Sequence, residues 1–166
     1  MEQAANEIAF RKPTAIERAF NSFFGFLVGR GLGMKHNYLL QVRGRKSGKI
    51  YSSPINLLEI DGKRFLVAPR GRTQWVRNAE AAGEVMLKKG SFRQNFELRP
   101  VPDVDKPRLL KKYLDSFKTT VQRYFPVPAG SEPQAFVRLA ASYPVFELLP
   151  RYYARRQCPA PPGFAV

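Results

Sequence analysis

Residues 44–48 read Gly-Arg-Lys-Ser-Gly and bring together the parts of an anion-binding turn. Glycines at both ends permit left-handed backbone that aims amide groups at one point. Ser47 adds a hydroxyl donor, while Arg45 and Lys46 offer charge-assisted hydrogen bonds to phosphate or carboxylate. The sequence therefore predicts a turn that binds an anion, although a solvated basic rim would have the same composition.

The spacing within this turn excludes a nucleotide-binding P-loop. That motif places four residues between its glycines and then needs Lys followed by Ser or Thr, whereas only three residues separate Gly44 from Gly48 and Ile50 follows Lys49. A nucleic-acid site would also need exposed aromatic side chains beside the cations for base stacking. Tyr51 is one such residue without a second in register, so nucleic acid is not the expected partner.

The charge of the whole chain points in the same direction as the turn. The 166 residues include 28 Lys and Arg against 13 Asp and Glu, which gives a net charge of +15. Such a field attracts polyanions, namely nucleic acid, anionic lipid or a multiply charged ligand, although it also aids solubility. A second basic pair, Arg70 and Arg72, follows the third predicted strand. If the strands pair as neighbours, Arg70 lies in the same groove as Lys46.

Residue counts limit the remaining chemistry. His36 is the one histidine and Cys158 the one cysteine, so the sequence offers neither an internal disulfide nor a Cys-based zinc site, and no metal is expected. We interpret His36 as a loop residue. The sequence has no signal-peptide pattern and no run of roughly 18 apolar residues. We therefore expect a cytoplasmic protein, with a peripheral position on the inner face of the cell membrane as an option.

The first predicted element is a helix that begins at the capping box Thr14 to Glu17 and ends before Gly29. It is rich in phenylalanine, at positions 20, 23, 24 and 26. These rings can pack in a core, cover a pocket as a lid, or anchor the helix at a membrane interface.

From Tyr38 onward the pattern becomes that of β-strands. Apolar and polar residues alternate around Leu40 and Val42, an extended run covers residues 50–60, and Asp61-Gly62 predicts a type I′ hairpin into residues 65–68. Pro54 inside the second strand indicates an edge or a bulge. Two further strands are predicted at 84–88 and 91–101, and a last one in "PVFELLP".

Helices are expected between these strands. Residues 74–82 read as a short helix with Thr73 as N-cap and Gly83 as terminator, a longer helix starts at Asp103 or Asp105, and a third covers residues 135–141. The pattern predicts an α+β protein, a small antiparallel split β-barrel of five or six strands with an N-terminal helix and helices inserted after strands 3 and 5. We expect a single domain, with a helical segment 1–36, the barrel 37–150 and a basic, Pro-rich tail 151–166.

The order of these features resembles a known family. "GRKSGKIYSSP", the Asp-Gly hairpin, "FLVAPRG", and Trp75 with Asn78 on a short helix are similar to the deazaflavin-dependent nitroreductases, which are split barrels related to the flavin-binding pyridoxamine oxidase-like proteins. The similarity covers about residues 38–101 and includes the closing strand. It departs from the family at Tyr51, where an arginine is usual, and at Gly71-Arg72, where a Gly-Gly pair is usual. Arg43, Lys49 or Arg72 can replace the lost charge.

The resemblance implies coenzyme F420 as cofactor, with FMN as second choice. Lys46 would hold the phosphate or the carboxylates of the oligoglutamate tail, Ser52, Ser53 and Pro54 would line the ring edge, and Ala68 and Arg70 would frame the phosphate side. Trp75 would pack near the ring or the substrate, or in the core. The implied cofactor-binding set is Arg45, Lys46, Ser47, Lys49, Ser52, Ser53, Pro54, Ala68, Arg70 and Trp75. Ser53 and Tyr124 are the candidate catalytic residues, as proton donors, with water as the alternative source of the proton.

The resemblance thus predicts an F420-dependent reductase that transfers a hydride to a hydrophobic acceptor, either a quinone, an enone or a nitroaromatic compound. Such a reaction depends more on the positioning of the hydride donor and the acceptor than on acid-base chemistry. This agrees with the absence of a paired-carboxylate motif. The alternative is a non-enzymatic barrel that binds a flavin, a haem-like or a lipid ligand, or a basic module on anionic membrane or nucleic acid. Either a monomer or a homodimer is compatible with the sequence.

Overall fold

The computed structural model describes residues 35–151. Its strands are β1 (Asn37–Arg43), β2 (Ile50–Ile60), β3 (Lys63–Val67), β4 (Glu84–Lys89), β5 (Phe92–Pro100) and β6 (Val145–Pro150). Its helices are α2 (Gln74–Ala82) and α3 (Lys106–Val121), with 3₁₀ segments η1 (Asp103–Asp105), η2 (Gln122–Tyr124) and η3 (Pro133–Ser142). The predicted helix at 14–28 and the tail with Cys158 lie outside the described residues.

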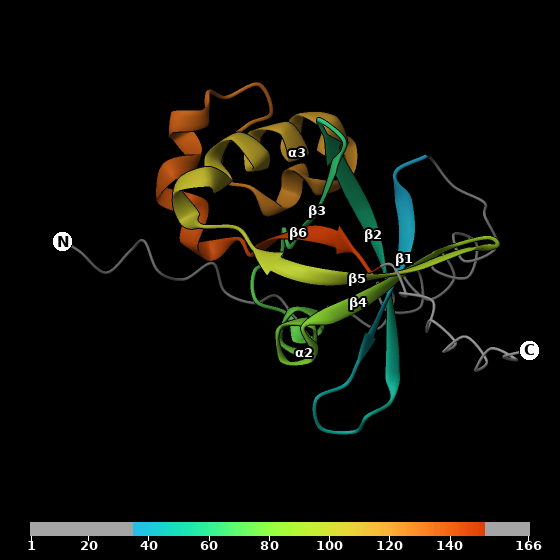
Figure 1. The fold of residues 1–166 in the computed structure, drawn as a ribbon. Helices are drawn as coiled ribbons and strands as arrows, with labels where there is room; N and C mark the ends of the chain where they lie inside the picture. Colours follow the sequence, from blue (N-terminus) through green and yellow to red (C-terminus); the bar gives the residue numbers. More distant parts are fainter. Residues whose placement is uncertain (1–34, 152–166) are drawn as a thin grey trace, which may run out of the picture.

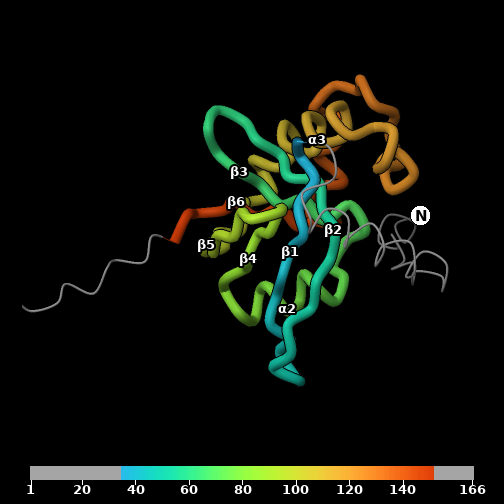
Figure 2. The backbone as a smooth tube through the Cα atoms, turned by 90° about the vertical axis from the view of Figure 1, so that its right-hand side faces the viewer, coloured from blue at the N-terminus to red at the C-terminus, as the bar shows by residue number. Residues whose placement is uncertain are grey.

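The six strands close into an antiparallel barrel in the order β1-β2-β3-β6-β5-β4. β6, the last strand within residues 35–151, completes it by inserting between β3 and β5. α2 follows β3, and the segment η1-α3-η2-η3 follows β5. Figures 1 and 2 show α3 and α2 on opposite sides of the barrel, with the β1–β2 turn projecting beyond α2. The predicted α+β split barrel, with helices after strands 3 and 5, is confirmed.

Apolar side chains on both faces of the strands explain the two cores. Leu57 faces the barrel interior, whereas its neighbour Leu58 faces α3, as the alternation of a strand requires. The interior core also takes in one face of α2 through Val76 and Ala79. The second core joins the outer face of the barrel to the aromatic side of α3 and η3. Strands buried on both sides therefore lack the clean apolar-polar alternation of an open sheet.

Pro54 illustrates how the sheet tolerates a missing donor. β2 pairs with β1 along its whole length, but with β3 only from Leu57 to Ile60. The amide of Leu57 donates toward β1, so the even-numbered residues before it, Pro54 included, turn their backbone groups to the unpaired side. Proline therefore costs no ladder hydrogen bond here, and the predicted edge is confirmed.

The turns and helix ends mostly follow the sequence. Asp61 and Gly62 have φ values of 50° and 75°, as a type I′ hairpin requires. Gly83 ends α2 in the left-handed conformation with φ 69°. Thr73 precedes α2 as predicted, but its side chain makes no capping hydrogen bond. Over residues 35–151, no helix has the length and apolar character that crossing a membrane requires.

Candidate functional site

The turn between β1 and β2 is closed by its own backbone. The amide of Gly44 donates to the carbonyl of Lys49 and the amide of Gly48 donates to the carbonyl of Gly44, both at 2.8 Å. Gly48 has φ +67°, a conformation that a residue with a Cβ rarely adopts. These bonds form a small loop whose tip carries Arg45, Lys46 and Ser47.

Tyr51 packs against the base of this turn. A Cβ added at Gly44 would lie 2.5 Å from Tyr51 Cε2, so glycine is required for the ring to approach. The hydroxyls of Tyr51 and Ser47 are 3.0 Å apart, and the amide of Lys49 donates to Ser47 Oγ at 3.3 Å. Tyr51 therefore has a structural part in the turn, and the Ser47 hydroxyl, predicted as a donor to an anion, is already engaged within it.

Arg45 fixes the turn to α2. Its guanidinium donates to Asn78 Oδ1 at 2.7 Å and to Gln74 Oε1 at 3.1 Å, and its backbone amide also donates to Asn78 Oδ1 at 3.3 Å. Gln74 and Asn78 are four residues apart and lie on one face of the helix. Asn78 is buried, with 7% of its surface exposed. Both acceptors are neutral amides, so they orient the guanidinium and leave its charge uncompensated.

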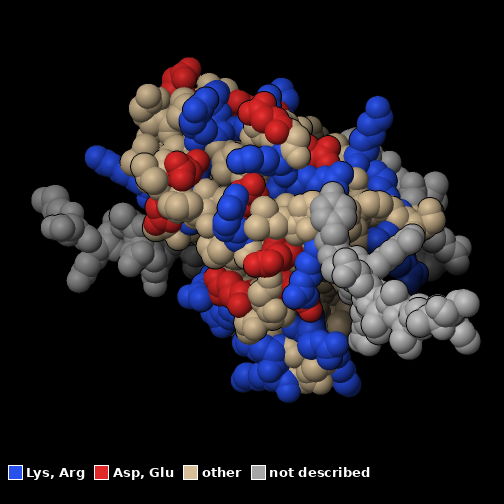
Figure 3. All heavy atoms as spheres, in the orientation of Figure 1, with Lys and Arg blue, Asp and Glu red and all other residues tan. Residues whose placement is uncertain are grey.

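The two lysines of the turn are exposed cations. Within residues 35–151, the ammonium groups of Lys46 and Lys49 make no hydrogen bond or ion pair. Figure 3 shows Lys and Arg gathered at the lower end of the molecule, where Figure 1 draws the β1–β2 turn. A ligand with several negative charges can therefore be held here without displacing an internal partner.

The predicted ring-edge residues do not share one face of β2. Ser53 lies opposite Leu40, whose side chain is buried in the barrel interior, so Ser53 is on the inner side. Ser52 and Pro54 lie on the other side by strand alternation, and Ser52 Oγ accepts a hydrogen bond from Gln41 Nε2 at 3.2 Å. A ligand held by side chains on one face of this strand therefore meets either Ser53 or the other two.

Arg70 and Tyr124 come together on the α3 side of the barrel. The Arg70 guanidinium lies 5.8 Å from the centre of the Tyr124 ring, and that of Arg123 lies 4.8 Å from it. Both distances fit cation–π contacts. Ala68 is buried, and its amide donates to the carbonyl of Pro144 at 2.9 Å. Arg70 therefore contacts η2 through the Tyr124 ring. The expected groove that Arg70 shares with Lys46 stays a prediction.

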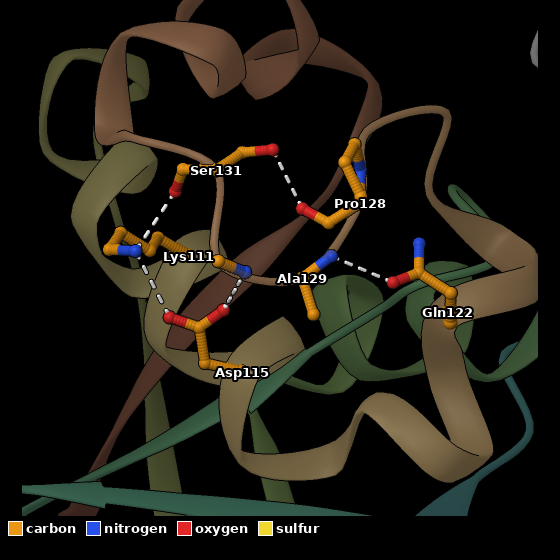
Figure 4. Close-up of polar contacts among 7 residues, drawn as sticks. Lys111, Asp115, Gln122, Pro128, Ala129 and Ser131 are labelled. Carbon is orange, nitrogen blue, oxygen red and sulfur yellow. Dashed lines mark hydrogen bonds and ion pairs between the residues drawn. The ribbon is translucent and has the colours of Figure 1, made fainter.

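The loop that follows η2 is held by a polar network, drawn in Figure 4. Gln122 Oε1 accepts from the amide of Ala129 at 2.8 Å, and Lys111 Nζ donates to the carbonyl of Ser131 at 2.9 Å. Asp115 Oδ1 accepts from the amide of Gly130 at 2.7 Å. Burial alone would raise the pKa of the Asp115 carboxyl, but the Gly130 bond and the Lys111 ammonium together lower that pKa below its usual value.

Tyrosines beneath this loop fix the position of η2. Tyr143 donates its hydroxyl proton to the carbonyl of Tyr124 at 2.7 Å. Burial raises the pKa of Tyr143 to about 12. Burial also raises the pKa of Tyr113, against the opposing effect of a hydrogen bond with Asn56. Both phenols are therefore neutral hydrogen-bonding groups, and that of Tyr143 holds the backbone at Tyr124.

Trp75 and His36 have packing roles in the structure. Trp75 is half-buried against the barrel interior, with its ring 6.5 Å from that of Phe146 in an edge-on arrangement. His36 lies in the turn before β1, as expected, with its ring 4.6 Å from Phe117. Burial, and to a smaller extent the charge of Lys89, lower the pKa of His36. In residues 35–151, no group of His, Cys, Asp and Glu side chains has the arrangement of a metal site.

The sequence matches a family model described as F420H(2)-dependent quinone reductase over residues 9–126. The chain belongs to this family. It is an oxidoreductase that uses coenzyme F420, and the resemblance seen in the sequence is confirmed. The match includes the cationic turn, α2 and most of the barrel. The segment from Val127 onward, with η3 and β6, lies outside it.

Two solved structures with a TM-score of 0.50 agree with the fold. The chain shares 11% identity and a TM-score of 0.50 with HutZ, a haem storage protein from Vibrio cholerae, over 71% of this chain and 83% of that one. It shares 19% identity and a TM-score of 0.50 with a structure described as a domain-swapped dimer, over 80% and 92%. An F420-H2 dependent reductase, FDR-A, is 20% identical over 69% and 94%, with a TM-score of 0.47. No curated protein matched the chain.

The charges at the turn are compatible with this cofactor. F420 carries a phosphate and several carboxylates, and cations that lack internal carboxylate partners are suited to such a ligand. Arg45 has only neutral amide partners, and Lys46 and Lys49 are exposed. The contact between Arg45 and Asn78 could not be read from the sequence as such. The sequence did contain one signal for this contact, because Asn78 is a polar residue on the buried face of a short helix.

Proposed function

We propose that the protein reduces a flat, hydrophobic acceptor, which is a quinone, an enone or a nitroaromatic compound, at the expense of reduced F420. The cationic turn fixed on α2 carries this proposal. Arg45 is oriented by Asn78 and Gln74 and keeps its charge, so the turn is a preformed anion site and does not need to order itself on binding. The family description supports the quinone as the first acceptor to examine.

Lys46 and Lys49 bind the phosphate in this proposal, with Arg45 as the fixed member of the set. Ser47 stabilises the turn through its contacts with Tyr51 and the amide of Lys49, so that its contribution to binding is indirect. When bound in its reduced form, the deazaflavin supplies a hydride. The protein contributes the orientation of donor and acceptor in near-attack geometry.

Two hydroxyl groups are the proposed proton donors. Ser53 Oγ lies on the inner face of β2, and the Tyr124 ring lies beside the Arg70 guanidinium on the α3 side. Ser53 faces the barrel interior, whereas Tyr124 packs on the α3 side of the barrel, so we expect only one of them to donate to the acceptor. Arg70 keeps the Tyr124 ring in place through its cation–π contact, while Tyr143 holds the backbone beneath.

The hydride acceptor and the proton donor can be tested in one anaerobic assay of F420H2 oxidation. The wild-type protein should oxidise F420H2 only when a quinone, enone or nitroaromatic acceptor is added. Removal of the hydroxyl that donates the proton, by either Ser53→Ala or Tyr124→Phe, should lower kcat by about 10²-fold, the typical effect of one general acid, and the other variant should leave kcat unchanged. Failure of all three acceptor classes with a protein that binds F420 would contradict the proposal.

The Phe-rich sequence before Gly29 adds a proposal about location. Quinones dissolve in membranes, and an apolar segment flanked by arginines is suited to the membrane interface. We therefore propose a peripheral position on the inner face of the cell membrane. Flotation with anionic vesicles, compared between the full chain and a Phe23→Ser, Phe24→Ser variant, would test it, and equal flotation of both would contradict it.

A further inference from the structure

A hollow beside the cationic turn is not used by the proposed reaction. It has a volume of about 500 Å³ and is lined by Arg45, Arg72, Arg77, Glu80 and Ala81. Four of these residues belong to α2 or the loop before it, and Arg45 belongs to the turn. Three guanidinium groups and one carboxylate therefore face one shallow space, with an excess of two positive charges.

The partners of the arginines show which charges are available. Arg72 donates through Nε and Nη2 to the same Glu80 oxygen, at 3.1 and 2.7 Å, so the one carboxylate of the hollow is already paired. Arg45 is held by the neutral amides of Gln74 and Asn78. In the part of the chain that the structure describes, the Arg77 guanidinium has no hydrogen-bonding or ionic partner. Arg45 and Arg77 are therefore both free to attract anions.

The position of the hollow indicates what kind of anion reaches it. Arg45 lines the hollow and is also the neighbour of Lys46 at the tip of the turn. A ligand whose phosphate lies at Lys46 can continue past Arg45 toward Arg77. A chain of carboxylates is suited to this arrangement, because arginine binds carboxylate oxygens in pairs.

We propose that this hollow binds the carboxylates of the cofactor's oligoglutamate tail, with Arg77 as the principal contact and Arg45 as the link to the phosphate site. The proposal rests on the proposed function, since it presupposes F420 at the turn. Glu80 limits the affinity, because it occupies Arg72 and repels the incoming carboxylates. The hollow therefore makes binding depend on tail length.

Fluorescence titration with two ligands tests the proposal. One is F420 with several glutamates, and the other is the same deazaflavin phosphodiester without glutamates. Arg77→Ala should weaken the long-tailed ligand by about three- to ten-fold, as expected for one partly exposed charge-assisted contact, and leave the tailless ligand unchanged. Glu80→Gln should tighten the long-tailed ligand alone by about two- to three-fold. Arg138→Ala, which removes an exposed charge from η3, is the matched control and should change neither.

Each result decides the proposal. An equal loss of affinity for both ligands in Arg77→Ala would show a general effect of charge. An unchanged affinity for the long-tailed ligand would show that the tail lies elsewhere. Either result overturns the proposal. Unchanged or weaker binding of the long-tailed ligand to Glu80→Gln also overturns it. Far-UV circular dichroism checks that the variants fold. Lys46→Glu separates this proposal from the proposed function, because unchanged binding of the tailless ligand to that variant would contradict the phosphate site itself.

Discussion

Asn78 is the residue on which the geometry of the turn depends. One buried amide oxygen accepts from both the backbone amide and the guanidinium of Arg45. A buried acceptor that serves two donors is costly to remove, since both donors then lose their partner. The anion site is therefore defined by a neutral side chain that need not touch the ligand.

Asn78→Ala should weaken F420 binding by about tenfold and lower the free energy of unfolding by about 1–2 kcal/mol, because two hydrogen bonds from Arg45 are lost. Fluorescence titration and urea unfolding measure the two effects. Asn78→Asp is the informative control, because it keeps the acceptor for Arg45 but neutralises its charge. It should retain the stability of the fold and still weaken F420 binding. Equal F420 affinity in all three proteins would contradict the positioning role.

For single residues, the sequence predicted which residues form the turn but not how their side chains are arranged. Gly44 and Gly48 were recognisable as turn residues, and Arg45 and Lys46 as its cations. The link from Arg45 to Asn78 spans 33 residues and exists only once α2 packs on β1. The predicted group Ser52, Ser53 and Pro54 ignored the alternation of β2, which separates Ser53 from its neighbours.

Among the elements, the loop after η2 is tied both to η2, through Gln122, and to α3. Asp115 on α3 binds the amide of Gly130 and pairs with Lys111, and together these contacts tie the loop to the helix. The pKa of its carboxyl is lower in the folded protein than its usual value. The carboxylate therefore stabilises the fold above its unfolded pKa, and this contribution is lost as the pH falls through the folded pKa.

Asp115→Asn should accordingly lower the free energy of unfolding at neutral pH by about 1 kcal/mol, the typical value for a hydrogen-bonded, partly exposed carboxylate. In acid, below the folded pKa, the wild type carries a neutral carboxyl and the difference between the two proteins should vanish. Urea unfolding at both pH values measures this. A difference that stays constant across the range would show that Asp115 acts through something other than its charge.

The elements themselves were well predicted from the sequence, because each has a local signal. The Asp-Gly hairpin, the Gly83 terminator and the edge position of Pro54 follow from backbone preferences. Thr73 has the extended backbone of an N-cap, but its hydroxyl makes no capping hydrogen bond, which the residue type alone does not predict. The 3₁₀ character of η3 was also missed, since its pattern reads equally as a short α-helix.

For the whole molecule, the charge of +15 raises the question of how much binding is unspecific. The barrel was predictable as a class, with its last predicted strand as the closing one, but the neighbours of that strand, β3 and β5, were not predicted, because β3 lies far from β6 in the chain. The fold places the turn at one end of the molecule (Figure 2), so that a few fixed cations, and not the total charge, meet the ligand.

Salt separates these contributions. Attachment of a polyanion through many scattered cations weakens by about 10³–10⁵-fold between low and moderate salt, whereas a few contacts in a formed site change far less. We expect the affinity for F420 to fall by less than about tenfold over the same range. Titrations at the two salt concentrations check this, with heparin as the polyanion for comparison. A fall in F420 affinity as steep as that of heparin would contradict a formed site.

The most direct measurement is a fluorescence titration of the purified protein with F420 and, in parallel, with FMN, repeated with Lys46→Glu. We expect saturable binding that favours F420, and the loss of this binding in Lys46→Glu without a change in thermal unfolding. A preference for FMN, or an unchanged affinity of Lys46→Glu for F420, would contradict the claim that the cationic turn is the cofactor's anchor.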